Sequence, residues 1–177
     1  MRRRTHAFAA LVLLTGLCAV LPGYAAPVRV APATVGATLQ AALHDRYGVE
    51  EGPVLQAAVA ESLGRALKAA GAAPDDSAAL RVEVSIEDAA PTHPTRHQQQ
   101  LNPSLDPLSS VSLGGARLRA VLRGVDGKEI DHVDYDYYAV SLDQVSPSGN
   151  AWADARVTIQ RFSDQVVKAW RRHASGT

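Results

Sequence analysis

Two segments of the chain place apolar residues at the three- and four-residue steps of an amphipathic helix. The first covers residues 53–70, with a proline in its first turn and a glycine just past its end. The second covers residues 150–173, from a capping asparagine to a cationic last turn that suits the helix dipole. Its stripe includes Trp152, Phe162 and Trp170, which we therefore assign to the core rather than to a ligand site. A shorter and weaker helical pattern precedes both.

Other segments alternate apolar and polar residues with the period of a half-buried β-strand. The clearest is residues 79–88, and a first strand at 28–35 is interrupted by Pro32. Two more runs, 111–125 and 128–140, flank Asp126–Gly127, the dipeptide that most strongly indicates a tight β-hairpin.

A two-residue hairpin loop fixes the register, because a slip by one residue would place arginines opposite apolar side chains. In this register apolar pairs share one face and charged pairs share the other. The pairs are Leu118 with Tyr135 on the apolar face, and Arg117 with Asp136 and Arg119 with Asp134, expected as surface ion pairs, on the polar face. Asp131 is an exception, since it falls on the apolar side near the tip. Tyr138 falls opposite Gly115, where its ring can cover the small residue.

The element order is strand, helix, strand, strand, strand, helix. Helices with one apolar stripe and strands with one apolar face predict an α+β fold, a two-layer sandwich in which a mainly antiparallel sheet carries two helices on one face. We expect a single domain over residues 26–177. The other face of the sheet is expected to be wet or covered by another molecule.

The first 25 residues have the layout of a secretory signal peptide. Three arginines precede an apolar run at residues 7–21, and cleavage after Ala25 leaves small residues at the required positions. The sequence thus predicts export, most simply to the periplasm. The alternative is a membrane-anchored protein, held by an uncleaved signal or by lipidation of Cys18, although Leu17 occupies a position that lipidation signals reserve for a small residue.

Charge and cysteine content exclude several functions. The chain has 18 basic and 18 acidic side chains, and loss of the three leading arginines leaves 15 against 18. A mildly acidic domain without a basic stripe is a poor binder of nucleic acid or anionic lipid. The mature chain would contain no cysteine, and no catalytic or phosphate-binding motif occurs. We expect no enzyme activity, cofactor or bound metal, and no integral membrane span in the mature chain.

One stretch remains, the proline-rich loop of residues 89–110. Connections of this length are commonly functional or disordered, so we predict either a recognition loop for an envelope protein partner or merely a long connection. Its candidate binding residues are Thr92, His93, Arg96, His97, Gln99, Asn102 and Asp106. Deleting residues 91–107 is expected to leave stability nearly intact. The alternative is a small-ligand or metal-binding protein, or a hydrolase, in which His93, His97 and His132 converge.

The strand-first exported start, the run "LGGARLRAVLRGVDGKEI" and the run "AWADARVTIQRFSDQVV" resemble, as a pattern over residues 28–173, uncharacterised proteobacterial envelope proteins and predicted lipoproteins. Their α/β domain is similar to the amino-terminal domain of TolB and to curli-transport-type proteins. The resemblance implies an accessory or assembly role in the envelope and supplies no catalytic residues.

Overall fold

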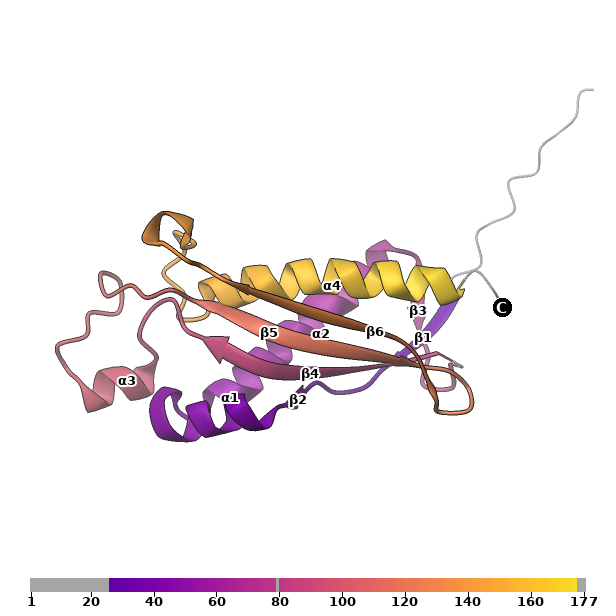
Figure 1. Ribbon diagram of the computed structural model, residues 1–177, viewed down its shortest axis with the longest axis horizontal. Helices are drawn as coiled ribbons and strands as arrows, with labels where there is room; N and C mark the ends of the chain where they lie inside the picture. Colours follow the sequence, from indigo (N-terminus) through magenta and orange to yellow (C-terminus); the bar gives the residue numbers. More distant parts are fainter. Residues whose placement is uncertain (1–25, 79, 175–177) are drawn as a thin grey trace, which may run out of the picture.

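The computed structural model describes residues 26–78 and 80–174. The predicted signal peptide, including Cys18, lies outside these residues. Figure 1 shows an elongated molecule in which a twisted sheet carries two long helices on one face. The predicted α+β two-layer architecture is confirmed.

The sheet is mixed, because its amino-terminal strands pair in parallel and its later strands pair antiparallel. The order across the sheet is β3-β1-β4-β5-β6, and β2 also pairs with β4. The strands are β1 (Ala26–Val30), β2 (Thr34–Val35), β3 (Ala72–Pro74), β4 (Arg81–Ala90), β5 (Gly115–Arg123) and β6 (Glu129–Tyr138). The expected first strand is thus two short strands separated at Pro32, and β3, which has no alternating pattern, was not predicted.

The described residues also form six helical segments. They are α1 (Ala37–Ala42), the π-helical turn η1 (Leu43–Tyr47), α2 (Glu51–Ala69), α3 (Arg96–Leu101), the 3-10 turn η2 (Leu142–Gln144) and α4 (Ala153–Ala174). The long helices α2 and α4 lie side by side on the sheet (Figure 1). α2 ends where Gly71 adopts a positive φ of 85°, a conformation that glycine accepts readily.

The core lies between the helices and the sheet. Leu55, Val59 and Leu63 of α2 are buried there against inward-facing residues of β4 and β5. The aromatic residues at the carboxyl end of the chain are buried as well, so their assignment to the core is confirmed: Trp152 just before α4, and Phe162 and Trp170 within it. Burial of this apolar surface is the main term that stabilises the fold.

The β5–β6 register is the predicted one over most of its length, from Gly115 opposite Tyr138 to Leu122 opposite Asp131. The tip differs. Gly127 has a φ of 74° and its N–H donates to the carbonyl of Gly124, which makes a three-residue loop rather than two. The register shift between Leu122 and Arg123 absorbs the extra loop residue, so the two deviations cancel.

Asp131, the charged residue on the apolar side of the hairpin, is bound by side chains at the end of α4. Oδ2 of Asp131 lies 2.8 Å from Nη2 of Arg172 and 3.0 Å from Nε2 of His173. These bonds, the one from Arg172 foremost, lower the pKa of Asp131. A charged residue on the apolar side of the hairpin therefore fastens the last turn of α4 to the sheet.

We expect Asp131→Asn to lower the free energy of unfolding at pH 7 by about 1 kcal/mol. The lowered pKa gives the wild type stability that is present above the unfolded-state pKa and is lost as the pH falls through the folded-state value. Urea denaturation between pH 7 and pH 2 should therefore show the two proteins converging in acid. Stability curves that coincide at every pH would mean that the Asp131 contacts contribute no net stability.

Candidate interaction surface

The proline-rich segment begins with a buried hydrogen-bond network. The hydroxyl of Thr92 donates to Oδ2 of Asp154 over 2.9 Å, and the backbone N–H of Asp154 donates back to Oγ1 of Thr92 over 3.0 Å. The N–H of Thr92 also donates to the carbonyl of Ala151 over 2.7 Å. Both side chains are buried. The segment is therefore fastened to the first turn of α4, 62 residues further along the chain.

The second oxygen of Asp154 secures another loop, since the N–H of Ser146 donates to Oδ1 over 2.8 Å. Gly114 packs against this network, and a Cβ there would overlap Oγ1 of Thr92 and lie 3.0 Å from the Asp154 carboxylate. One buried carboxylate thus joins the loop before β5 to the loop after β6.

Thr95 closes the network on its other side. Its hydroxyl donates to the carbonyl of Tyr47 over 2.7 Å, and its side chain and that of Gln98 form a reciprocal capping box at the start of α3. The segment expected to be irregular therefore contains a helix that starts after its second proline. The Thr-x-x-Gln spacing is the sequence signal that could have revealed it.

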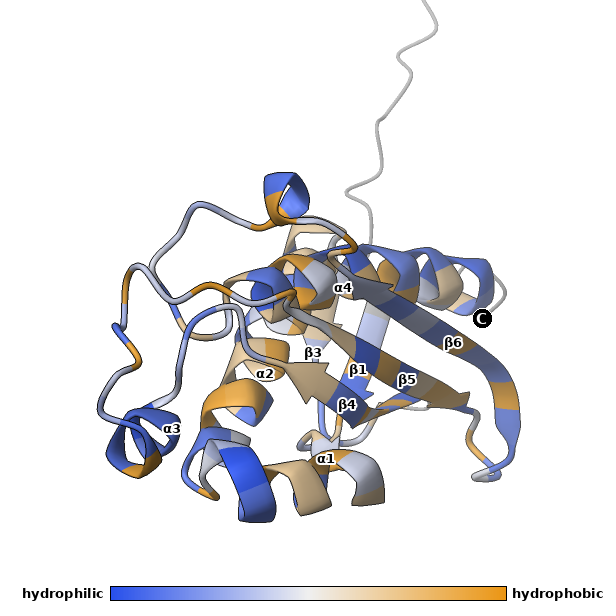
Figure 2. Ribbon diagram, turned by 60° about the vertical axis from the view of Figure 1, so that its left-hand side comes forward, coloured by the Kyte–Doolittle hydropathy of each residue, from blue (hydrophilic) through white to orange (hydrophobic). Residues whose placement is uncertain are grey.

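Beyond this base the segment is exposed, together with the loop after β6. Leu108 is 70% exposed, Val140 76% and Leu142 67%. Gly149 lies beside Leu108, close enough that a Cβ would be 3.1 Å from its Cδ2, so the two loops touch. We call this end of the molecule, residues 96–113 and 140–150, the loop pole. It projects at the end of the molecule opposite the β5–β6 hairpin tip (Figure 1), and Figure 2 shows apolar residues along its loops. Its exposed aliphatic side chains are Leu101, Leu108, Val111, Leu113, Val140 and Leu142.

The structure divides the residues proposed from the sequence for partner binding. Thr92 and His93 are buried, so their side chains serve the interior and the expectation that they contact a partner is corrected. Those at the surface of the loop pole are Arg96, Asn102 and Asp106, with His97 and Gln99 partly exposed. Several of these polar groups serve local turns. Asp106, for example, accepts the N–H groups of Leu108 and Ser109, and these bonds lower its pKa.

The three histidines of the metal alternative do not converge. His93 is buried beneath the loop pole and His97 lies on α3, whereas His132 lies on β6 opposite Val121, toward the hairpin tip. His132 there neighbours Glu129, with Nδ1 3.1 Å from Oε1. Within residues 26–78 and 80–174, no three histidine, cysteine or acidic side chains form a cluster suited to a metal ion.

The open face of the sheet carries ion pairs. Nη1 of Arg119 lies 3.0 and 2.9 Å from the two oxygens of Asp134, while Nε of Arg123 lies 2.8 Å from Glu83. Arg117 stands opposite Asp136 as expected, but these two side chains form no ion pair, which corrects that prediction. The face is charged, balanced in sign and not covered by either long helix (Figure 1).

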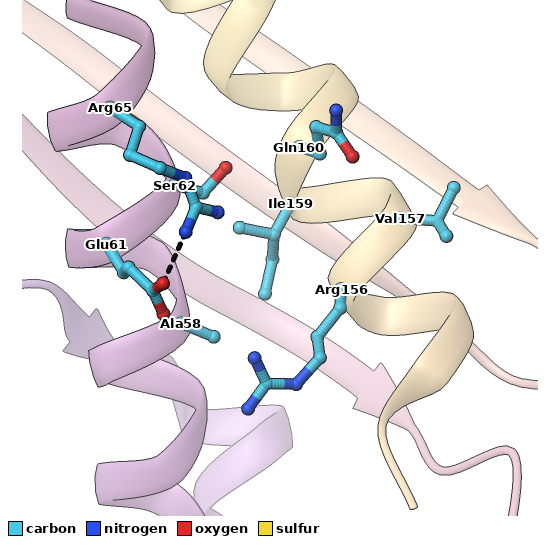
Figure 3. A pocket seen from close by; sticks show the side chains of 8 residues that line it. All are labelled: Ala58, Glu61, Ser62, Arg65, Arg156, Val157, Ile159 and Gln160. Carbon is cyan, nitrogen blue, oxygen red and sulfur yellow. Dashed lines mark hydrogen bonds and ion pairs between the residues drawn. The ribbon is translucent and has the colours of Figure 1, made fainter. Parts of the chain in front are cut away.

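A groove of about 240 Å³ runs between α2 and α4 (Figure 3). Arg65 and Glu61 on its rim pair with each other, and the buried hydroxyls of Ser62 and Ser163 meet 3.1 Å apart between the helices. The groove is a seam between two packed helices with an exposed charged rim. A second, more apolar groove of about 440 Å³ lies between α2 and the strands β1 and β3.

Comparison with solved structures identifies the fold. Protein XCC0632 from Xanthomonas campestris, of the DUF330 family, superposes with a TM-score of 0.50 over 88% of this chain and 90% of its own, at 11% identity. The two proteins share a fold. This confirms, for the fold, the resemblance to uncharacterised proteobacterial proteins.

Two further structures match more distantly. The hypothetical protein CT253 from Chlamydia trachomatis gives a TM-score of 0.45 at 11% identity, with 86% of this chain and 99% of that one covered. Lipoprotein GNA1162 from Neisseria meningitidis gives 0.36 at 11% identity with the same coverage. No family model and no curated protein matches the sequence.

In the part of the chain that the structure describes, none of the helices combines the length and apolar character needed to span a bilayer.

Proposed function

We propose that the protein is a non-enzymatic interaction module that is exported to the periplasm and consists of a single domain. Its loop pole binds an apolar segment of an envelope protein partner. The observation that carries this proposal is the set of aliphatic side chains exposed on two adjoining loops. Soluble proteins rarely leave such a concentration of apolar surface without a binding role. Removal of residues 1–25 as a signal peptide, without lipidation at Cys18, belongs to the same proposal.

The loops are held in place, which favours recognition. Thr92, Thr95 and Asp154 fix their bases by buried hydrogen bonds. Binding then costs less conformational entropy than it would for a free loop. The side chains at the tips are not engaged in this support and remain available.

A protein partner fits the loop pole better than a lipid surface. Arg96 is the one exposed arginine or lysine of the loop pole, and Asp106 and Asp143 offset its charge. Anionic membranes attract clusters of lysine and arginine, and interfacial segments carry tryptophan or tyrosine, neither of which occurs on these loops. A surface of aliphatic side chains with little net charge suits the core of a protein–protein interface.

A non-enzymatic role is supported by how the polar groups are used. Both oxygens of the buried Asp154 carboxylate accept hydrogen bonds, one from Thr92 and one from Ser146, and Asp134 forms an ion pair with Arg119. These contacts are structural, and each satisfies an acceptor that a catalytic group would keep available for a substrate.

We expect the double substitution Leu108→Ser and Leu142→Ser to abolish partner recovery while changing the free energy of unfolding by less than about 0.5 kcal/mol, because both side chains are exposed. Photo-crosslinking groups placed at 108 and 142 in living cells should capture the same protein. The matched control is position 125 at the hairpin tip, where Val125 is 83% exposed. Equal capture at all three positions, or capture at 108 that persists in Leu142→Ser, would show that the loop pole is not the binding surface.

The structure also changes how the loop should be removed. Excising residues 91–107 deletes Thr92 and Thr95 and leaves Asp154 without its partner, so the earlier expectation of unchanged stability is revised. A shorter excision within residues 102–109 spares the network.

A further inference from the structure

The two edges of the sheet differ. β3 has three residues and ends in Pro74, which has no N–H to offer a neighbouring strand. β6 has ten residues, contains neither proline nor lysine, and pairs with no strand on its outer side in the described part of the chain (Figure 1). A long edge strand of this kind is a template for pairing with another chain.

The groups that β6 offers outward can be identified from one bond. The N–H of Ala139 donates to the carbonyl of Gly114 over 2.9 Å, which continues the β5–β6 pairing. Since bonding direction alternates along an antiparallel strand, the odd-numbered residues from 131 to 137 face β5 and the even-numbered ones from 132 to 138 direct N–H and C=O groups outward; the bulge before residue 131 ends this alternation. The outward N–H of His132 is at present satisfied by Oδ1 of its neighbour Asp131, 2.9 Å away.

The sequence of β6 is self-complementary in one antiparallel register. With the two copies centred on Val133, over residues 131–135 those that face the helices oppose each other, as do those of the open face, and no acidic side chain directly opposes another. The opposed pairs are Asp131 with Tyr135 and His132 with Asp134. The bulge before Asp131 turns Glu129 to the open face, beside Arg119 and His132, so the regular pairing ends at residue 131. Centring the pairing on Asp134 would instead set two carboxylates against each other, and centring it on His132 would set two imidazoles against each other.

The positions of the helices are compatible with the same β6–β6 pairing. α4 contacts both β5 and β6, so its axis lies above the space between them. Strands are about 4.8 Å apart, and two copies joined through β6 would therefore hold their α4 axes about 10 Å apart. That spacing is close to the roughly 8–10 Å at which helices pack.

We propose that two copies of this chain form a two-fold dimer by antiparallel β6–β6 pairing centred on Val133, so that the two sheets become one continuous sheet. Asp134 then lies between Arg119 of its own chain and His132 of the second copy. A second copy fits this edge better than an unrelated extended peptide, because the symmetric register makes the His132–Asp134 contact twice and also brings α4 against its counterpart. The dimer leaves both loop poles free, directed to opposite ends.

The first test is sedimentation equilibrium of the purified exported protein with His132→Asp, which sets a carboxylate against Asp134 of the second copy at two symmetric places. We expect a concentration-dependent dimer for the wild type and a dimer dissociation constant raised at least about tenfold by the substitution, because opposed like charges cost binding energy. His44→Asp is the matched control, since His44 is also exposed but lies on η1, away from β6. The double substitution His132→Asp and Asp134→His, which exchanges the two residues and leaves the composition unchanged, should restore the dimer.

The second test fixes the register. Opposed Val133 residues form a non-hydrogen-bonded pair, with Cα atoms about 4.5 Å apart, a spacing that permits a disulfide. In a Cys18→Ser background, Val133→Cys should therefore give a disulfide-linked dimer on mild oxidation. Tyr135→Cys should not, because position 135 opposes position 131.

Three results would each overturn the proposal. One is a wild type that stays monomeric at concentrations of tens of micromolar. Another is a dimer that is unaffected by His132→Asp but lost in the Leu108→Ser, Leu142→Ser protein, which would place the contact at the loop pole. The last is equal linkage at 133 and 135. Circular dichroism of each variant verifies that loss of the dimer is not loss of the fold.

Discussion

Replacing Asp154 with alanine is expected to lower the free energy of unfolding by about 3 kcal/mol, because it leaves the Thr92 hydroxyl and the Ser146 N–H without their acceptor in a buried site. A smaller contribution is lost with the negative charge in the first turn of α4. Urea denaturation measures the change. Hydrogen exchange should accelerate most in the segments that Asp154 fastens, residues 91–95 and 146–152.

The control for this experiment lies on the same helix. Asp164 is exposed on α4, and Asp164→Ala should change stability by less than about 0.5 kcal/mol. A similar loss in both variants would assign the effect to the helix rather than to the network. Asp154→Asn should fall between the two, because its carbonyl oxygen can still accept the N–H of Ser146.

The second large effect is expected at Gly115, where β5 and β6 approach under the ring of Tyr138. A Cβ at this position would overlap the carbonyl oxygen of Tyr137 and lie 2.6 Å from Cα of Tyr138. These are backbone atoms, so the strands themselves must move. We expect Gly115→Ala to destabilise the protein by about 3 kcal/mol in urea denaturation.

Tyr138 makes this site sensitive to movement. Its hydroxyl donates to Oδ2 of Asp88 over 3.0 Å, and burial together with the Asp88 charge raises the pKa of Tyr138. Gly124→Ala is the control, since a Cβ there meets side-chain atoms no closer than 3.4 Å. If the two substitutions cost the same, the close approach at Gly115 is not what limits that position.

Periodicity alone determined the large elements. The helical stripes fixed α2 and α4, and the buried aromatic residues of α4, because a helix with one apolar face has one stable way to meet a sheet. The β5–β6 register was also determined locally, since a slip by one residue exposes every apolar side chain. The predicted hairpin loop was one residue too short, and a compensating bulge kept the register.

The candidate site depended on contacts that no local pattern contains. Arg96, Asn102 and Asp106 could be found from the sequence as polar residues of a long loop, and they are exposed as expected. The burial of Thr92, in contrast, depends on Asp154, which is remote in the sequence.

The exposed aliphatic side chains of the loop pole were missed for the same reason. Leu108 and Leu142 have the composition of core residues, and only the packing of two loops on one buried carboxylate leaves them outside. Sequence alone thus determined the two long helices, strand β4 and the β5–β6 register. The tertiary structure decided which residues of the loop are support and which are surface, because hydrogen bonds between distant segments are selected by the folded chain as a whole.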